Sequence, residues 1–202
     1  GCYHESIQEL QTALDADPVN ADAYYNMASS YHGLGKVNGD QAMLMQAEQL
    51  YNQCLDISPD HPDCHRGLAC LLVETGRSDK AFTLLNRWAQ RSPQLIDPHV
   101  ELARLYQEFG QPQMAVRNLE QAVAVDPDNP QAARAWAALA SLREQTGETQ
   151  QALVDYYRAQ QLNPNQPAVS QRIAALQRAM GGPPAVAAGG TRFVLRQRLF
   201  DG

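Results

Sequence analysis

The sequence predicts an all-α protein built as a solenoid, in which helical hairpins repeat along the chain and stack on one another. Regularly spaced helix-breaking residues are the first observation that predicts this fold. Successive glycines lie 34, 41, 34, 37 and 34 residues apart at Gly1, Gly35, Gly76, Gly110, Gly147 and Gly181. Prolines stand 17 residues after four of these glycines, at Pro18, Pro93, Pro127 and Pro164. Because glycine commonly ends a helix and proline forbids its continuation, these alternating breakers mark out repeated helix pairs.

The segments between the breakers have the periodicity of amphipathic helices, which is the second observation. Apolar residues recur three or four positions apart, at Val100, Ala103 and Tyr106 in one segment and at Ala115, Leu119, Ala122 and Val125 in the next. This spacing places them on one face of a helix. Small residues also recur in register where two helices must approach closely, at Ala28, Ala69, Ala103, Ala140 and Ala174 and at Ala47, Ala81, Ala115 and Ala152.

These positions resemble the tetratricopeptide repeat (TPR), whose 34-residue helix-turn-helix unit carries the pattern W-x2-L-G-x2-Y, A-x3-F and P. The chain matches it at Tyr24-x2-Met27-Ala28-x2-Tyr31, Ala47-x3-Tyr51 and Pro59; at His65-x2-Leu68-Ala69-x2-Leu72, Ala81-x3-Leu85 and Pro93; at His99-x2-Leu102-Ala103-x2-Tyr106, Ala115-x3-Leu119 and Pro127; and at Trp136-x2-Leu139-Ala140-x2-Arg143, Ala152-x3-Tyr156 and Pro164. The resemblance implies a right-handed α-solenoid whose first helices line a concave groove for a peptide or a partner helix.

By this period the chain divides into complete repeats flanked by partial ones. The expected units are 1–20 as the second half of a truncated repeat, 21–61 as a repeat with a seven-residue insertion, 62–95 and 96–129 as regular repeats, 130–166 as a repeat with a lengthened first helix, 167–180 as a closing helix, and 181–202 as a linker and an extended tail. Turns between the two helices of a repeat are expected near Gly35, Gly76, Gly110 and Gly147.

The beginning of the chain has two interpretations. Gly1 precedes Pro18 by the same 17 residues as in later repeats, which predicts half a repeat and a fragment of a longer, bacterial protein. Alternatively, Gly1-Cys2 is the processed end of a lipoprotein, with an acylated Cys2 that anchors the protein to a membrane. We favour the half-repeat because the sequence runs straight into a helix. Localisation stays open between cytoplasm and periplasm, with anchoring only if Cys2 is lipidated.

Composition and charge argue against several classes of function. The formal charge of −6 and the pI near 5.3 disfavour a nucleic-acid partner, since phosphate recognition needs clustered lysine and arginine. No apolar run approaches the length of a transmembrane helix. The motifs of serine hydrolases, P-loops, zinc peptidases, dinucleotide sites and EF-hands are missing from the sequence. We therefore expect neither an enzyme nor a cofactor.

Cysteine and histidine gather in the segment HPDCH at 61–65. We expect a buried, packed His65 and no metal site, because His65 falls on the bulky core position that Trp136 fills in a later repeat. Cys54 and Cys64 flank one turn. Whether they are bonded stays open, since disulfide geometry cannot be judged from sequence.

The candidate binding residues are those that the first helix of each repeat is expected to point into the groove. They are Tyr25, Ser29, Arg66, Cys70, Arg104, Glu108, Arg134 and Ser141. Three of them, Arg66, Arg104 and Arg134, come from consecutive repeats and form a possible ladder for a carboxylate-bearing segment. The alternative is that each arginine pairs with a neighbouring Asp or Glu. The lysines and asparagines with which family members hold the C-terminal carboxylate of heat-shock chaperones are missing here.

Two further segments are candidate contacts with a partner. Asp40 is expected to cap an early start of the second helix in the inserted repeat, a helix that carries Met43, Leu44 and Met45. The tail is basic and apolar and contains Phe193, Leu199 and Phe200. Because exposed apolar side chains are unfavourable in water, we expect the solenoid, a second copy of the chain or a partner to cover them.

The sequence thus predicts a non-catalytic scaffold that holds a peptide or a helix of a partner protein, within a multiprotein assembly. Two alternatives stay open. One is a regulatory or substrate-positioning arm of a larger enzyme, and the other is a lipid-anchored envelope assembly factor.

Overall fold

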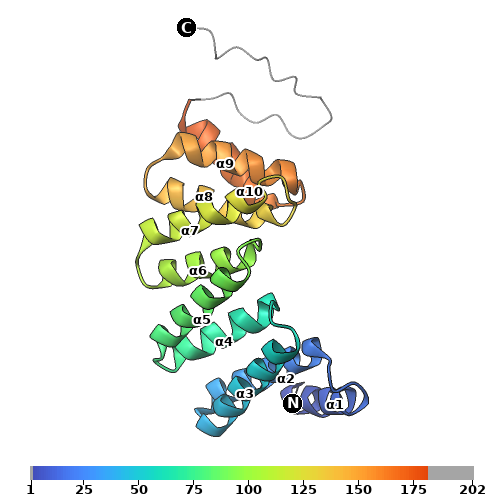
Figure 1. Ribbon diagram of the computed structural model, residues 1–202. Coiled ribbons are helices and arrows are strands. Elements are labelled where there is room, and N and C mark those ends of the chain that lie inside the picture. The colour runs from blue at the N-terminus through green and yellow to red at the C-terminus, as the bar shows by residue number, and fades with distance from the viewer. Residues whose placement is uncertain (1, 182–202) are drawn as a thin grey trace.

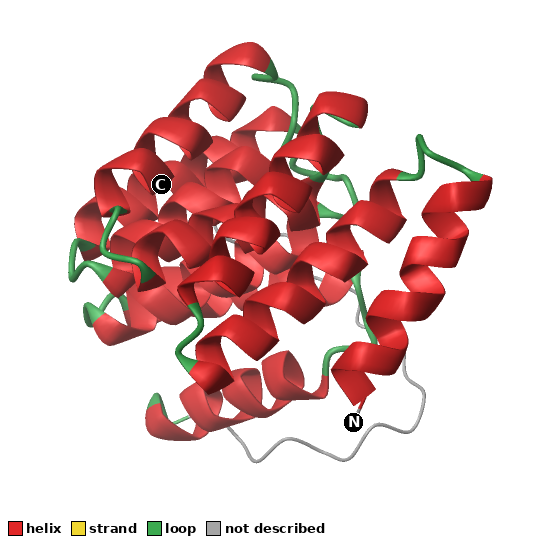
Figure 2. Cartoon of the chain, turned by 90° about the horizontal axis from the view of Figure 1, so that it is seen from below, coloured by secondary structure: helices red, strands yellow, loops and turns green. Residues whose placement is uncertain are grey.

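A computed structural model describes residues 2–181, and all regular structure in that range is helical (Figures 1 and 2). The helices are α1 (Cys2–Ala16), α2 (Ala21–Asn38), α3 (Gln41–Ile57), α4 (Pro62–Glu74), α5 (Ser78–Arg91), α6 (Asp97–Glu108), α7 (Pro112–Val125), α8 (Ala132–Gln145), α9 (Thr149–Leu162) and α10 (Pro167–Ala179). Each helix packs against the next, so the stack follows chain order from α1 to α10 (Figure 1). The predicted all-α solenoid of helical hairpins is confirmed.

The regularly spaced alanines lie in the core, where they let neighbouring helices approach closely. Eight of them have at most 1% of their surface exposed: Ala28, Ala69, Ala103, Ala140, Ala47, Ala81, Ala115 and Ala152. Ala174, at the end of the stack, is half-buried. Larger side chains such as Leu71, Leu85, Leu105 and Leu139 fill the layers between the hairpins. Each buried leucine side chain contributes about 1.5–3 kcal/mol by leaving water.

The turn expected at Gly35 was placed wrongly, because the chain turns at Gly39. Gly35 lies inside α2, where the lack of a side chain makes room for Leu44 of α3. Gly39 ends α2 with a left-handed backbone (φ 66°), and the Asp40 carboxylate accepts backbone N–H hydrogen bonds at the start of α3. The predicted Asp40 cap is confirmed. Since Gly39 precedes Pro59 by 20 residues, the insertion lengthens both helices by about one turn and keeps their faces in register.

The remaining turns agree with the expected positions. Gly76, Gly110 and Gly147 all have positive φ, as does Gly181 after α10. A left-handed backbone at the end of a helix strongly favours glycine, because the residue has no Cβ to clash with the chain. The glycine period therefore reports this turn geometry directly.

His65 is buried as expected, with 3% of its surface exposed. Its ring stacks on Trp88 with the ring centroids 4.0 Å apart, and its Nε2 lies 3.0 Å from the carbonyl oxygen of Pro59. Burial lowers the pKa of His65 to about 4, because a charged ring would lose its hydration. Trp88 also donates from Nε1 to Asp60 at 2.9 Å. These contacts fasten α4 and α5 to the turn that precedes α4.

Several predictions concern parts of the chain outside the described residues. They are those on Gly1, on the side chain of Cys2, and on the linker and tail at 182–202 with Phe193, Leu199 and Phe200. Within 2–181, no helix combines the length and the apolar character needed to cross a membrane.

Candidate interaction groove

The first helices of the repeats, together with α10, share one side of the stack. α2 packs on α4 and α4 on α6, whereas the second helices make fewer contacts with one another. Ion pairs also join successive first helices: Lys36 with Glu74, Arg66 with Glu101, Arg134 with Glu101, and Arg172 with Glu144. The side on which neighbouring hairpins converge is the concave side of a solenoid. We call the surface of α2, α4, α6, α8 and α10 on this side the groove face.

Glu101 of α6 is the centre of the charge network on the groove face, and only 1% of its surface is exposed. Arg66 Nε and Arg104 Nε donate to its two oxygens at 2.7 and 3.0 Å, and Arg134 Nη2 lies 3.8 Å from Oε1. A buried carboxylate needs such partners, since an unpaired charge in the interior is strongly unfavourable. The three predicted ladder arginines therefore converge on one carboxylate of the protein itself. Arg134 is the most accessible, with 62% of its side chain exposed.

Other acidic residues balance the arginines further. Asp63 accepts a hydrogen bond from Arg66 at 2.8 Å, and Glu108 lies 3.5 Å from Arg104. Burial raises the pKa of Asp97 at the start of α6, although Arg134 and Arg66 act in the opposite direction. With four acids around three arginines, the middle of the groove face has no excess of positive charge.

The α2–α4 junction carries a second polar group. Glu74 accepts a hydrogen bond from Lys36 Nζ at 2.7 Å and lies 3.1 Å from His32 Nε2. Burial acts in the opposite direction, but these hydrogen bonds hold the pKa of Glu74 below its usual range. The Tyr51 hydroxyl lies 3.5 Å from His32 Nδ1, and burial raises the pKa of Tyr51. Cys70, also expected in the groove, is a half-buried free thiol.

A hollow of about 510 Å³ opens at the C-terminal end of the groove face. We call it the α8–α10 hollow; its walls include Ala137, Ser141 and Gln145 of α8 and Ala168 and Val169 of α10. Arg172 Nε donates to Glu144 at 3.1 Å, and the Tyr156 hydroxyl donates to the same carboxylate at 3.2 Å. The hollow thus combines small apolar side chains with a neutralised pair of charges.

The other predicted groove residues lie at separate places on the groove face. Tyr25 of α2 is half-buried, and its ring lies against that of His61 with the centroids 5.8 Å apart. Ser29 is exposed on α2, more than two repeats away from the α8–α10 hollow in which Ser141 lies. The predicted residues are therefore positions along one face and do not form one compact cluster.

The predicted contact segment of the insertion lies on α3, a second helix. Met43 and Leu44 are half-buried, and Leu44 fills the space beside Gly35. Met45 has 63% of its surface exposed. Of the three residues, Met45 is thus the one most open to solvent.

Sequence reasoning missed Glu101, because it stands at a helix position outside the pattern expected for the groove. The equivalent positions of the other repeats hold Asn26, Gly67 and Ala138, none of which is charged. A single carboxylate at an otherwise uncharged position, flanked by arginines of three repeats, is the signal that pointed to a shared charge.

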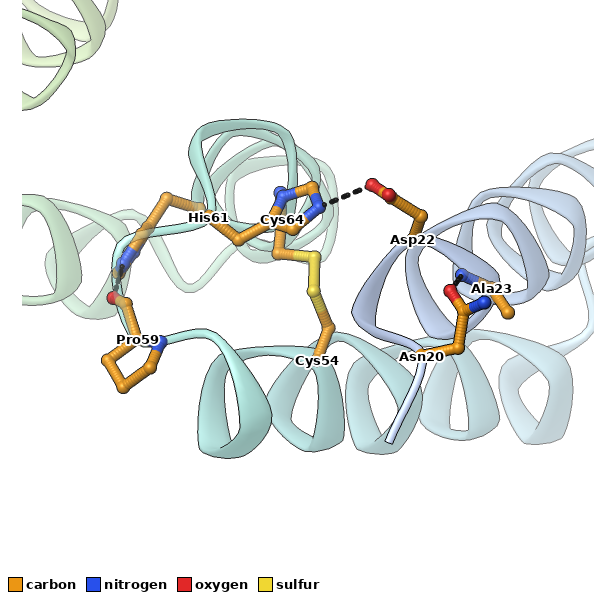
Figure 3. Close-up of a disulfide and its surroundings, with 8 residues drawn as sticks. Asn20, Asp22, Ala23, Cys54, Pro59, His61 and Cys64 are labelled. Atoms are coloured by element: carbon orange, nitrogen blue, oxygen red, sulfur yellow. Dashed lines mark hydrogen bonds and ion pairs between the residues drawn. A yellow bond between two sulfur atoms is a disulfide. The ribbon is translucent and has the colours of Figure 1, made fainter. Parts of the chain in front are cut away.

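The structure joins Cys54 and Cys64 by a disulfide, with their Cα atoms 6.5 Å apart (Figure 3). Cys54 lies in the last turn of α3 and Cys64 in the first turn of α4, so the bond crosses the turn between two repeats. His61 caps α4 by accepting the Cys64 N–H at 3.3 Å through Nδ1, and its Nε2 lies 3.0 Å from Asp22 of α2. His65, which the sequence places next to this group, is engaged in the core instead.

Comparison with protein families agrees with the repeat architecture. Models described as tetratricopeptide repeat match residues 40–105 and 100–167, and a model described as TPR repeat matches residues 1–35. The chain belongs to the tetratricopeptide-repeat family. Members of this family are generally non-catalytic modules for interaction with other proteins.

Known relatives share the fold at low sequence identity. Human Tetratricopeptide repeat protein 16 is 23% identical over 132 residues, which are 64% of this chain but 15% of that protein. The thermophilic TPR protein TTC0263 of Thermus thermophilus has a TM-score of 0.63 at 21% identity, over 87% of this chain and 91% of its own. Yeast Tom70 has a TM-score of 0.75 at 15% identity, over 87% of this chain and 36% of its own.

A further solved structure is that of YrrB, described as a TPR protein with an unusual peptide-binding site. It has a TM-score of 0.50 at 16% identity, over 84% of this chain and 82% of its own. At such identities the likeness to solved structures establishes the fold alone.

Proposed function

We propose that this TPR chain is a non-catalytic scaffold that holds a segment of a partner protein on its groove face, and that the α8–α10 hollow receives a side chain of that segment. The observation that carries the proposal is the hollow itself, which lies between two neighbouring first helices. Family membership supports the class of function, since TPR domains are generally protein-interaction modules.

The chemistry of the hollow favours an uncharged segment. Ala137, Ala168 and Val169 offer apolar contacts and leave room, because two of the three side chains are single methyl groups. Ser141 and Gln145 offer hydrogen-bonding groups to the backbone or side chains of a bound segment. The charged residues beside them already satisfy each other. We infer that an apolar side chain enters the hollow while polar groups at its rim orient the segment.

The middle of the groove face suits a different task. Arg66 and Arg104 donate to buried Glu101, so a ligand carboxylate would have to compete with a bond that is already formed. The proposal that these arginines hold an acidic segment therefore reduces to Arg134, the exposed member. We assign Arg66 and Arg104 to holding repeats together and the α8–α10 hollow to binding.

A peptide library tests the proposal directly. The full chain is immobilised, and random peptides displayed on phage are selected for binding to it. Selected peptides should lose at least tenfold in affinity for variants Ala137→Arg and Ser141→Arg, because a long charged side chain fills the hollow. They should bind variant Val154→Arg unchanged, since Val154 is exposed on the second helix α9 and does not line the hollow.

Circular dichroism and thermal unfolding establish that each variant is folded before its affinity is compared. Peptides that bind all three variants as well as the natural chain would contradict the assignment of the hollow. A selection that enriches nothing above background would contradict peptide binding by this groove.

A further inference from the structure

Two cysteines and a histidine meet between α3 and α4, at a place that the groove does not use. Both sulfurs and one ring nitrogen of His61 lie within 4.8 Å of one another. Cys54 and Cys64 are fully buried, and 11% of the His61 side chain is exposed (Figure 3). Thiolate and imidazole are the ligand types that zinc prefers in proteins.

We propose that the reduced protein binds one Zn²⁺ ion through Cys54, His61 and Cys64, and that the disulfide and the metal site are alternative states of the same three side chains. Tetrahedral zinc with Zn–S bonds of about 2.3 Å would hold the two sulfurs about 3.8 Å apart. The Cα atoms of the two cysteines are 6.5 Å apart. Side-chain rotation can provide this sulfur spacing, so the two helices need not move apart.

Asp22 gives the imidazole the support that a metal-ligating histidine usually has. Its carboxylate lies 3.0 Å from His61 Nε2, so a proton on Nε2 is held there and Nδ1 keeps its lone pair. A carboxylate that accepts the second ring N–H is a common outer partner of zinc-bound histidine. Nδ1 now accepts the Cys64 N–H and caps α4. On metal binding this lone pair would pass from the helix cap to the ion.

His65 is excluded as the fourth ligand by its place in the core. Its Nε2 lies 3.0 Å from the carbonyl oxygen of Pro59, and its ring is stacked on Trp88. The site therefore has three protein ligands, and we assign the fourth position to water. Zinc with three protein ligands and a water is a known coordination type.

The chemistry of the exchange balances in two steps. A dithiol reductant transfers two electrons and two protons to the Cys54–Cys64 disulfide, which breaks the S–S bond, yields two thiols and turns the reductant into its own disulfide. Zn²⁺ then binds both sulfurs as thiolates and releases two protons. The metal itself is neither oxidised nor reduced.

The site would fasten three helices of two repeats. Cys54 belongs to α3, His61 and Cys64 belong to the start of α4, and Asp22 belongs to α2. The disulfide clamps the α3–α4 turn under oxidising conditions. The metal would clamp the same turn under reducing conditions.

Cobalt is the probe for this site, because Co²⁺ bound by thiolates in a tetrahedral site gives characteristic charge-transfer and visible absorption. The full chain carries Cys2→Ser and Cys70→Ser, so that only the two site cysteines remain. It is reduced with a dithiol, freed of the reductant without air, and titrated with Co²⁺ and then with Zn²⁺. We expect one Co²⁺ per chain, displaced by one Zn²⁺, and no thiolate–cobalt absorption from the oxidised chain.

Two variants keep both cysteines and test the other groups. His61→Ala should weaken metal binding by at least tenfold, and Asp22→Asn should weaken it by about 10–100-fold. The matched variant Asp63→Asn, which removes a nearby carboxylate that pairs with Arg66 instead, should bind as tightly as the background chain. Absence of thiolate–cobalt absorption from the reduced chain, or equal affinity in His61→Ala, would overturn the proposal. Circular dichroism of each reduced chain checks that it is folded.

Discussion

Arg66 of α4 donates through Nε to Glu101 of α6 at 2.7 Å, and the accepting carboxylate is buried. The bond joins the first helices of two consecutive repeats. Arg104 and Arg134 approach the same carboxylate from α6 and α8, so one buried charge is shared by three repeats. Because a repeat protein is stabilised by contacts between neighbouring units, a single substitution at Glu101 acts on two junctions at once.

Substitution Glu101→Gln should lower the free energy of unfolding by about 1.5–3 kcal/mol, because it removes the charge that three guanidinium groups contact. Urea unfolding followed by circular dichroism measures the change. Glu108→Gln is the matched control, since Glu108 is a largely exposed partner of Arg104 and should cost less than about 0.5 kcal/mol. Equal effects of the two substitutions would show that Glu101 is an ordinary surface acid.

Gly67→Ala should destabilise the protein by about 1–3 kcal/mol, although alanine is the better helix former. A Cβ on residue 67 would stand 2.5–2.7 Å from the ring and hydroxyl oxygen of Tyr51, whose side chain is buried. The ring would have to move away from His32. Ser29→Ala, at an exposed position in α2, supplies the control. A Gly67→Ala chain at least as stable as the natural one would mean that Tyr51 has room to shift.

Reduction of the Cys54–Cys64 disulfide should cost about 2–3 kcal/mol of stability, the loop-entropy expectation for cysteines ten residues apart. Denaturant unfolding with and without a dithiol measures it, in the presence of a chelator so that no metal replaces the bond. The Cys70→Ser variant should respond to the dithiol as the natural chain does, because Cys70 is a free thiol. Unchanged stability on reduction would contradict a structural role for the bond.

His99 should make the stability depend on pH below neutrality. Burial lowers the pKa of His99 in the folded chain below its usual value of about 6.5. Between the folded and unfolded pKa values the unfolded chain binds a proton that the native chain does not, so stability is full above pH 6.5 and falls as the pH drops. His99→Phe keeps a ring and removes this titration.

The measurement is the free energy of unfolding of both chains at pH 7 and pH 5. The natural chain should lose more stability between the two values than His99→Phe does. Equal losses would mean that His99 is protonated as easily in the folded as in the unfolded chain.

The repeat architecture could be predicted because the features that define it are local. A left-handed turn favours glycine, a helix stops before proline, and closely packed helices need alanine, so each leaves a regular trace in the sequence. The prediction failed at Gly35, where a glycine serves close packing against Leu44 and the turn moves to Gly39. Periodicity alone does not distinguish these two uses of glycine.

The groove could be predicted as a face but not as a set of contacts. Helix period placed Arg66, Arg104 and Arg134 on one side, yet whether a guanidinium meets a ligand or a neighbouring acid depends on distances between repeats. Glu101 decides it, and its burial follows from packing rather than from its own type. The α8–α10 hollow likewise arises from the angle between two helices, which no residue pattern encodes.

The measurement that tests the central claim most directly is amide hydrogen exchange of the full chain with and without a selected peptide. If the groove face binds the segment, protection should rise in α8 and α10 around Ser141 and Val169, and the second helices α5, α7 and α9 should change less. Protection centred on α5, α7 or α9, with α8 and α10 unchanged, would place the partner on the opposite side and contradict the account.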